Sequence, residues 1–183
     1  MFTEIEQIGA RGAYILGPNV RAFEEEAAAY LDAAHGVAVA NGTDGLVLSL
    51  RALDVGPGDE VITSPFTFFA TAEAISMVGA TPVFVDVREE SFNLDPARAA
   101  ERITERTKAI LPVHIFGHPA DMGELKALAD AHDLHLVEDG AQAFGAKDGD
   151  RFVGSIGDAG CFSFYPTKVL GCYGDGALVT AVS

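Results

Sequence analysis

The sequence predicts an α/β domain of three layers (α/β/α), in which helices cover both faces of a seven-stranded, mainly parallel mixed sheet. Short β-branched apolar segments alternate with segments of helical pattern, and most of the apolar segments are apolar on both faces. Strands of this kind, joined by helices, are typical of parallel sheets covered on each side. The chain has 183 residues, of which 49% are hydrophobic, so it can bury one sizeable core.

Seven strands and four helices are expected, with the helices between the first five strands. The strands are predicted at 36–41, 60–65, 81–87, 109–115, 135–139, 160–165 and 176–182, and the helices at 43–53, 68–78, 95–104 and 121–133. The third helix begins with Asp95 as its N-cap, followed by Pro96, and Asp121 is expected to cap the fourth. Aspartate suits these positions because its carboxylate accepts hydrogen bonds from the free amides of a helix start.

The last part of the chain is rich in glycine. Residues 141–158 contain four glycines and no helical period, which predicts an ordered, turn-rich loop. The link between the last two strands contains three more glycines and is too short for a helical crossover. We therefore expect those two strands to pair in an antiparallel arrangement.

The charge balance excludes several classes of partner. Twelve basic and 27 acidic side chains give a formal charge of −15, which repels nucleic acid and anionic membranes. No apolar run approaches the roughly 20 residues that span a bilayer, and residues 1–20 lack the pattern of a signal peptide. We expect a cytoplasmic protein that binds neither nucleic acid nor membranes.

No metal site is expected. Cys161 and Cys172 lack a CxxC spacing, so they are expected to be reduced thiols. His114 and His118 are four residues apart, but they lie on a predicted strand and the loop after it. That spacing brings two rings together on a helix and not on a strand.

Lys168 follows an apolar run, residues 161–167, and is one of only four lysines. An amine behind a buried strand loses hydration, which lowers its pKa and favours the nucleophilic form. Such a lysine can form a Schiff base with a carbonyl compound. From this residue alone, a surface lysine that caps the strand end is the alternative.

A possible phosphate cradle follows the first predicted strand. Asn41-Gly42-Thr43-Asp44-Gly45 combines glycine, a hydroxyl and the free amides of a helix start. A simple N-cap role for Thr43 or Asp44 is the alternative. The sequence contains neither a GxGxxG nor a GxxxxGK[ST] motif, so a dinucleotide or ATP site lacks its usual signature.

Further candidates follow other strands, where ligands of α/β sheets bind. Phe68 belongs to an aromatic cluster that could hold a flat ring, although core packing explains most such phenylalanines. Glu138 and Asp139 end the fifth strand, where a carboxylate is expected to face the crevice, and Gln142 follows them. Ser163 lies on the sixth strand.

One ligand would use all of these groups, and that ligand is pyridoxal phosphate. Its aldehyde suits Lys168, its phosphate suits Thr43 and Ser163, its ring suits Phe68, and its ring nitrogen suits Asp139. A carboxylate beside that nitrogen keeps the ring protonated, so that the ring can accept electrons from a substrate.

Several blocks of sequence are ordered and spaced as in the DegT/DnrJ/StrS family of sugar aminotransferases, which the chain resembles over nearly its whole length. These enzymes are fold type I proteins that depend on pyridoxal phosphate. The blocks are YILGP at 14–18, ANGTD at 40–44, GPGDEVI at 56–62, TKAI at 107–110, PVH at 112–114, PADM at 119–122, EDGAQA at 138–143 and FSFYPTK at 162–168.

The resemblance implies a role for each candidate residue. Lys168 would be the catalytic residue that binds the cofactor covalently and then moves the proton. The cofactor-binding residues would be Asp139 at the ring nitrogen, Gln142 at the ring hydroxyl, Phe68 on the ring face, and Thr43, the amide of Asp44 and Ser163 at the phosphate. Lysine at position 168 favours transamination, because related dehydratases carry histidine there. Tyr14 and Tyr173 are expected to line the crevice.

The resemblance also implies a function. It implies amino transfer from glutamate or glutamine to the keto group of a nucleotide-linked sugar, by a homodimer. Family members continue into a second, smaller domain, so residues 1–183 are expected to form the pyridoxal phosphate-binding large domain alone, like that of aspartate aminotransferase. One alternative is a truncated, non-catalytic module that binds pyridoxal phosphate or a partner chain. Another is a generic nucleotide-binding α/β domain in which Lys168 is structural.

Overall fold

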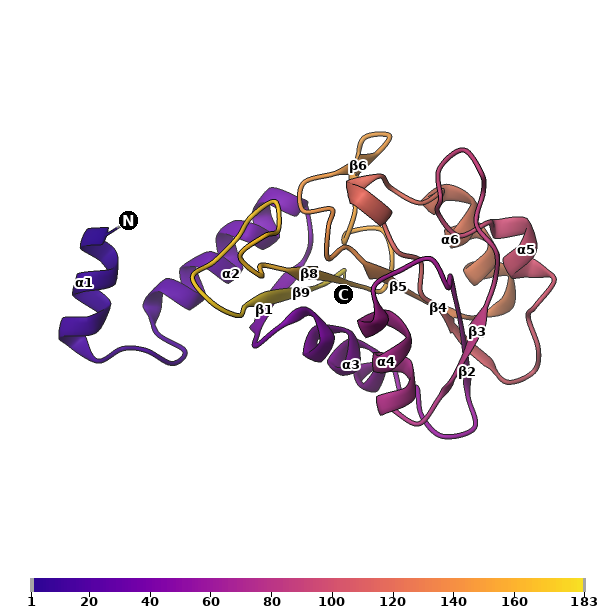
Figure 1. Ribbon diagram of the computed structural model, residues 1–183, viewed down its shortest axis with the longest axis horizontal. Coiled ribbons are helices and arrows are strands. Elements are labelled where there is room, and N and C mark those ends of the chain that lie inside the picture. Colours follow the sequence, from indigo (N-terminus) through magenta and orange to yellow (C-terminus); the bar gives the residue numbers. More distant parts are fainter. Residues whose placement is uncertain (1, 183) are drawn as a thin grey trace.

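A seven-stranded mixed sheet forms the centre of the protein in the computed structural model, which describes residues 2–182 (Figure 1). The strands follow the order β1-β9-β8-β5-β4-β2-β3 across the sheet. Strand β9 is antiparallel to both of its neighbours, and the other pairs are parallel. The predicted mixed sheet and the predicted antiparallel pair are both confirmed. The strands are β1 (His35–Val39), β2 (Glu60–Thr63), β3 (Thr81–Phe84), β4 (Thr107–Ile110), β5 (His135–Asp139), β8 (Ala159–Ser163) and β9 (Ala177–Ala181).

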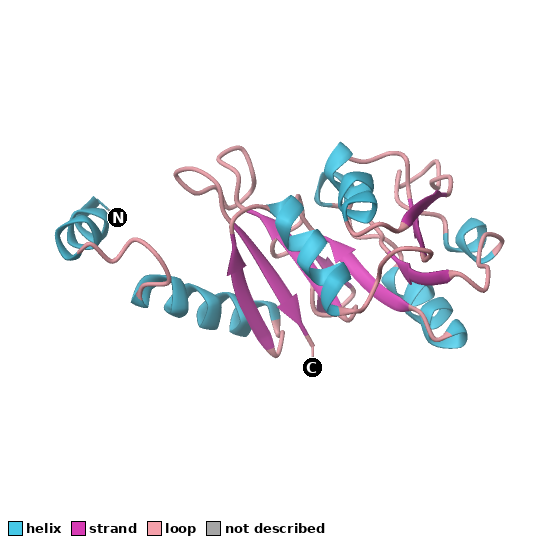
Figure 2. Ribbon diagram, turned by 90° about the horizontal axis from the view of Figure 1, so that it is seen from below, coloured by secondary structure: helices cyan, strands magenta, loops and turns pink. Residues whose placement is uncertain are grey.

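Helices cover both faces of this sheet and give the predicted three layers (Figures 1 and 2). Helices α3 and α4 pack on one face, and α2, α5 and α6 pack on the other. None of the helices within residues 2–182 is long and apolar enough to cross a membrane. The helices are α1 (Phe2–Arg11), α2 (Pro18–Leu31), α3 (Gly42–Ala52), α4 (Phe69–Met77), α5 (Pro96–Ala100), the 3₁₀ helix η1 (Ile115–Gly117) and α6 (Met122–His132).

Neighbouring residues of the central strands contribute to two different cores. Val61 packs in the cluster beneath α3 and α4, whereas Ile62 packs in the cluster beneath α5 and α6. Successive side chains of a strand point to opposite faces, so a strand buried on both sides needs apolar residues at both positions. This requirement explains why the strands read as continuous apolar runs in the sequence.

Two N-terminal helices were not predicted. Helix α2 packs through Ala27 and Leu31 against Phe162 and Leu178, and Phe23 lies beside the same cluster. The spacing of Phe23, Ala27 and Leu31 is a helical signal that the sequence contains. Helix α1 stands apart from the sheet and its helices in both views (Figures 1 and 2).

Several predicted boundaries were wrong by a few residues. Strand β4 ends at Ile110, and of the predicted continuation only Val113 pairs, through an isolated bridge to Asp139. Helix α5 is one turn and a half long; its predicted cap is confirmed, because Asp95 accepts a hydrogen bond from the amide of Ala97 (2.9 Å). Asp121 precedes α6 but makes no cap bond, and its carboxylate pairs with Arg88 instead.

The predicted loop at 141–158 contains a small hairpin. Strands β6 (Lys147–Asp148) and β7 (Arg151–Phe152) pair in an antiparallel arrangement, with Gly149 in the turn between them at φ +61°. Gly154 follows at φ +82°, and its Cα lies against Gly160 and the ring of Phe162. The segment that follows the hairpin therefore packs on β8 through a position where a side chain has no space.

Substitution of Gly154→Ala should lower the free energy of unfolding by about 3 kcal/mol, because the new Cβ combines a strained positive φ with overlap of the Phe162 ring. Gly149→Ala is a matched control: its φ is also positive, but no atom lies within 4 Å of the added Cβ. The control should cost only about 1 kcal/mol. Urea unfolding of both variants measures the difference, and equal losses would contradict this account of the packing.

Candidate active site

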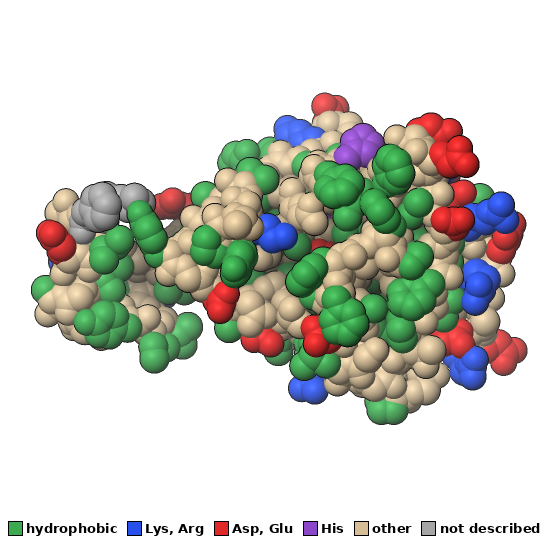
Figure 3. Space-filling view, in the orientation of Figure 1, with side chains coloured by type: hydrophobic (Ala, Val, Ile, Leu, Met, Phe, Trp, Pro, Cys, Tyr) green, Lys and Arg blue, Asp and Glu red, His purple; other side chains and the backbone are tan. Residues whose placement is uncertain are grey.

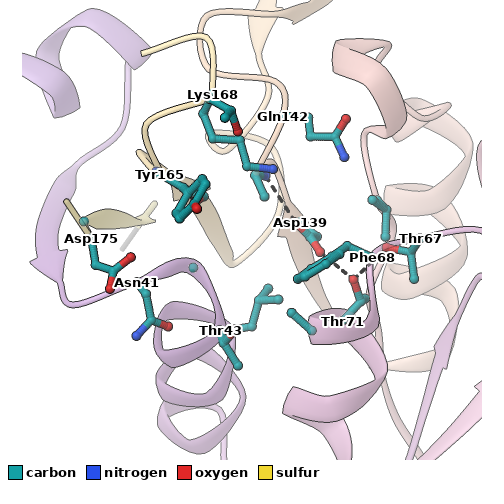
Figure 4. Close-up of a pocket in the computed structure, with 18 residues that line it drawn as sticks. Asn41, Thr43, Thr67, Phe68, Thr71, Asp139, Gln142, Tyr165, Lys168 and Asp175 are labelled. Atoms are coloured by element: carbon teal, nitrogen blue, oxygen red, sulfur yellow. Dashed lines mark hydrogen bonds between the residues drawn. The ribbon is translucent and has the colours of Figure 1, made fainter. Parts of the chain in front are cut away.

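A cavity of about 520 Å³ opens beyond the carboxyl ends of the parallel strands (Figure 4). Its walls come from the starts of α3 and α4, from the ends of β5 and β8, and from the segment that joins β8 to β9. Ligands of open α/β sheets bind at this edge of the sheet. The lining residues include Asn41, Thr43, Thr67, Phe68, Thr71, Asp139, Gln142, Ser163, Tyr165, Lys168 and Asp175.

The structure brings six of the seven predicted site residues to this cavity. They come from four separate stretches of the chain and are Thr43, Phe68, Asp139, Gln142, Ser163 and Lys168. Tyr14 and Tyr173, which were expected to line the crevice, do not line it and are 70% and 77% exposed. The expectation for these two tyrosines was wrong.

Asp44, the seventh residue, is not among the cavity-lining residues. Its amide donates a hydrogen bond to Oδ1 of Asn41 (2.9 Å), and its carboxylate accepts one from the side-chain amide of Asn41 (3.0 Å). Asn41 is therefore the N-cap of α3, a role that the sequence suggested for Thr43 or Asp44. Gly42 lies next to Ser163, so that a Cβ at position 42 would approach the serine Cβ to 3.2 Å. This close approach brings the start of α3 to the end of β8.

Asp139 ends β5 and is only 5% exposed. Thr71 donates its hydroxyl to Oδ2 (2.7 Å), and the amide of Ala141 donates to Oδ1 (3.1 Å). Burial raises the pKa of Asp139 above its ordinary value, although these two hydrogen bonds and the charge of Lys168 act in the opposite direction. Among the described residues, no basic side chain forms an ion pair with it. A cation presented from the cavity would fit this carboxylate.

Lys168 lies in the segment between β8 and β9 and points its amine into the cavity, on the side where Asp139 lies (Figure 4). Its amide donates to the carbonyl of Tyr165 (2.8 Å), which fixes the backbone turn that carries the side chain. The side chain is half-buried. This position differs from that of a surface lysine that caps a strand.

Phe68 lies at the cavity as the N-cap residue of α4, and its side chain is 73% exposed. The neighbouring Phe66 does not line the cavity and packs against Phe92 and Phe116 instead. The exposed ring of Phe68 is available to a flat ligand, whereas core packing does not explain it.

Of the two carboxylates at the end of β5, Asp139 faces the cavity, as expected of a carboxylate there, and Glu138 does not. It is fully buried on the other side of β5, where four donors bind it. Nε2 of His114 lies 3.0 Å from Oε2 of Glu138, and the amides of Gly154, Ile156 and Gly157 donate at 2.7–2.9 Å. Burial acts to raise the pKa of Glu138, but these hydrogen bonds outweigh it and the pKa is lowered.

The tautomer of His114 follows from its partners. Its Nδ1 accepts a hydrogen bond from the amide of Ala120 (3.0 Å), so this nitrogen carries no proton. The remaining proton is on Nε2 and is donated to Glu138. His114 is thus a neutral structural residue, and its backbone amide also donates to the carbonyl of Asp139 (3.0 Å).

Two cavity residues, Thr67 and Thr71, were missed in the sequence. They are four residues apart: Thr71 lies in the first turn of α4, and Thr67 lies just before its N-cap, Phe68. That spacing was the available signal, but their partner Asp139 is far away in the sequence. Within residues 2–182, no group of three or more potential ligands could hold a metal ion.

Comparison with known proteins identifies the family. The family model described as the DegT/DnrJ/EryC1/StrS aminotransferase family matches residues 1–183. The chain belongs to this family. It spans about half the length of the curated relatives it matches.

Individual members of the DegT/DnrJ/EryC1/StrS family are closely similar to this chain. The chain is 54% identical over 179 residues to the UDP-N-acetyl-3-dehydro-alpha-D-glucosamine 3-aminotransferase of Acidithiobacillus ferrooxidans. This match covers 98% of this chain and 48% of the relative. Among solved structures, S. venezuelae DesV in complex with a ketimine intermediate is 49% identical in sequence to this chain. The two structures superpose with a TM-score of 0.95, and the match covers 98% of this chain and 48% of that chain.

A more distant structure has the same fold. The PLP form of Spr1654 from Streptococcus pneumoniae is 31% identical in sequence to this chain. Its TM-score is 0.94, and the match covers all of this chain and 50% of that one. The fold of the family is therefore retained at low sequence identity.

Replacing Glu138→Gln should lower the free energy of unfolding at pH 7 by about 3 kcal/mol, because a neutral amide cannot accept from all four buried donors. The lowered pKa means that Glu138 stabilises the fold above its ordinary pKa of about 4.3, and that this contribution is lost as the pH falls through the lowered value. The difference between variant and wild type should therefore shrink on acidification through that window.

Urea unfolding at several pH values measures this effect. Glu124→Gln is the control, because Glu124 is an exposed carboxylate that pairs with Arg88 at the surface. Its loss should change stability by no more than about 0.5 kcal/mol. A loss for Glu138→Gln that stays constant below pH 4 would refute the role of its charge.

Proposed function

We propose that the protein is a pyridoxal phosphate-dependent aminotransferase that transfers an amino group from glutamate or glutamine to a keto group of a nucleotide-linked sugar. The observation that carries this proposal is a cavity in which Lys168 and the cation-deficient carboxylate of Asp139 lie together. Family membership and the aminotransferase names of close relatives support it. The reaction would serve the synthesis of amino sugars.

The side chains of the cavity fit pyridoxal phosphate. When bound, the cofactor supplies an aldehyde that takes up the amino group and a ring that accepts electrons from the reacting carbon. Asp139 would hold a proton at the ring nitrogen, since it is a buried carboxylate without a cation of its own among the described residues. Phe68 would lie against the ring, and Gln142 would contact the ring hydroxyl.

Lys168 would hold the cofactor covalently and, once displaced by an amino donor, move a proton between substrate atoms. Its flexible stem and its half-buried position at the cavity suit both tasks. Tyr165 lines the cavity on the same side as Lys168 and would limit the movement of its side chain (Figure 4).

Thr43 and Ser163 would bind the phosphate together with the start of α3. The macrodipole of that helix favours an anion at its N-terminus, and Gly42 allows the serine to approach. Asp44 belongs to this proposed set only through its amide, which would exchange its bond with Asn41 for one with the phosphate. Local donors of this kind are required because the net charge of −15 repels anions.

We also propose that residues 1–183 form the cofactor-binding large domain and that the protein is a homodimer. The apolar surface supports the dimer: Tyr14, Ile15 and Leu16 are 70–86% exposed, and Phe69 and Phe116 are 71% and 72% exposed. Apolar side chains also gather on the face shown in Figure 3. Exposed apolar patches of this kind are typical of protein interfaces.

A non-catalytic, cofactor-binding module is the second candidate function. The chain spans about half the length of the curated relatives it matches. A module of this kind would bind pyridoxal phosphate at Lys168 without completing amino transfer.

Lys168→Ala should abolish covalent attachment of pyridoxal phosphate, because no other amine lines the cavity among the described residues. Borohydride reduction followed by intact-mass measurement detects the attached cofactor directly. Lys126→Ala is the matched control, since Lys126 pairs with Asp130 on α6 and should leave attachment unchanged. A covalent adduct that persists in Lys168→Ala would rule out the assignment of this lysine.

Adding glutamate to the cofactor-loaded chain should convert the visible absorbance of the pyridoxal form to that of the pyridoxamine form. Gel filtration of the same sample should show a dimer. A pyridoxal band that glutamate and glutamine both leave unchanged would favour the non-catalytic module. Elution as a monomer would contradict the proposed homodimer.

A further inference from the structure

A chain of two threonine hydroxyls ends at Asp139 (Figure 4). The Oγ1 atoms of Thr67 and Thr71 are 2.8 Å apart, and Oγ1 of Thr71 lies 2.7 Å from Oδ2 of Asp139. Thr71 is fully buried, whereas Thr67 is half-buried at the cavity wall. The chain of hydroxyls therefore runs from the cavity wall to a buried carboxylate.

The direction of these hydrogen bonds is fixed by chemistry. An ionised carboxylate only accepts, so Thr71 donates its single hydroxyl proton to Asp139. The hydroxyl of Thr71 then has no proton left for Thr67, so Thr67 is the donor in the bond between them. Each bond polarises the next, which strengthens the donation to Asp139.

Among the described residues, Thr71 is the side chain that donates a hydrogen bond to Asp139. The amide of Ala141 binds the other carboxylate oxygen. The titratable groups that face Asp139 are Lys168 across the cavity, the neutral ring of His114, and the buried thiol of Cys161 on β8. Neither Lys168 nor His114 forms an ion pair with Asp139 in the described part of the chain.

We propose that Thr71, supported by Thr67, is a positioning residue that keeps the Asp139 carboxylate ionised and directed at the ring nitrogen of pyridoxal phosphate. This inference rests on the proposed function. It adds Thr71 of α4 and Thr67, which precedes that helix. Neither would touch the reacting atoms, and both would control where the proton between Asp139 and the ring nitrogen lies.

A neutral donor suits this task better than a cation. A lysine or arginine beside Asp139 would stabilise the carboxylate, but it would also satisfy its charge and weaken its attraction for a protonated ring nitrogen. A hydroxyl stabilises the ionised form through one hydrogen bond and leaves the charge uncompensated. Without that bond Asp139 becomes the stronger base, and the proton moves from the ring nitrogen toward the carboxylate.

The test compares Thr71→Val, which keeps the shape and removes the hydroxyl, with Thr71→Ser, which keeps the hydroxyl. Carbon-13 NMR of aspartate carboxyl groups in the cofactor-free protein follows the titration of Asp139, and Asp139→Asn identifies its signal. Thr71→Val should raise the titration midpoint of Asp139 by about one to two pH units, as expected for one hydrogen bond to a charged group. Thr71→Ser should restore the wild-type midpoint.

A second measurement uses pyridoxal phosphate labelled with nitrogen-15 in its ring. In the loaded protein, Thr71→Val should move the ring-nitrogen signal toward that of a neutral pyridine, whereas Thr71→Ser should match wild type. Thr67→Val should shift both readouts in the same direction but less. Thr63→Val is the matched control, because Thr63 is a fully buried threonine whose hydroxyl donates to the carbonyl of Leu111 (2.7 Å) and not to the site.

The outcomes separate this inference from the proposed function. Wild-type protein that fails to bind pyridoxal phosphate would remove the proposed function, while the titration of the cofactor-free protein would still decide whether the threonines support Asp139. Equal midpoints for wild type, Thr71→Val and Thr67→Val would overturn the inference even if the cofactor binds. If Thr71→Val does not fold, Thr67→Val decides between the two results.

Discussion

The buried charge of Glu138 is the interaction on which both the sheet and the cavity depend. Its carboxylate is fully buried and is held by His114 and by three amides of the segment that follows the β6–β7 hairpin. A buried charge is tolerated only when it is hydrogen-bonded to this extent. The same bonds attach that segment to β5 and hold His114, whose backbone in turn binds Asp139. Interactions on the face of β5 that points away from the cavity therefore help to position Asp139 at the cavity.

The sequence predicted the sheet well because burial on both faces forces long apolar runs into every central strand. It predicted boundaries less well, because an apolar run continues wherever the chain stays buried: residues 111–113 are as apolar as β4 but only Val113 pairs. Helix α1 carries Ile5 and Ile8 at helical spacing, a signal present in the sequence even though this helix stands apart from the sheet. The single-domain organisation of residues 1–183 and the cytoplasmic location stay predictions.

Most of the cavity was also predictable, because chemistry-bearing residues at strand ends converge on one edge of a parallel sheet. What the sequence could not reveal was direction. Glu138 and Asp139 look equivalent in the sequence, yet only Asp139 faces the cavity. The role of Thr71 became visible only through its hydrogen bond to Asp139, which is 68 residues away in the sequence. Asp44 and Asn41 are neighbours in one motif, and only the backbone geometry of α3 decides which of them is the cap.

Glu138 and Asp139 are consecutive residues that must point to opposite faces of β5. The register of β5 against its neighbouring strands therefore affects both residues at once. A slip of one residue against β4 and β8 would turn every side chain of the strand to the other face. A slip in either direction would take Glu138 away from the amides that hold it and would turn Asp139 out of the cavity. Stability and ligand binding would be lost in the same step, so a misaligned chain could not persist as a folded but inactive form. Correct strand register and ligand binding thus both depend on the pair Glu138 and Asp139.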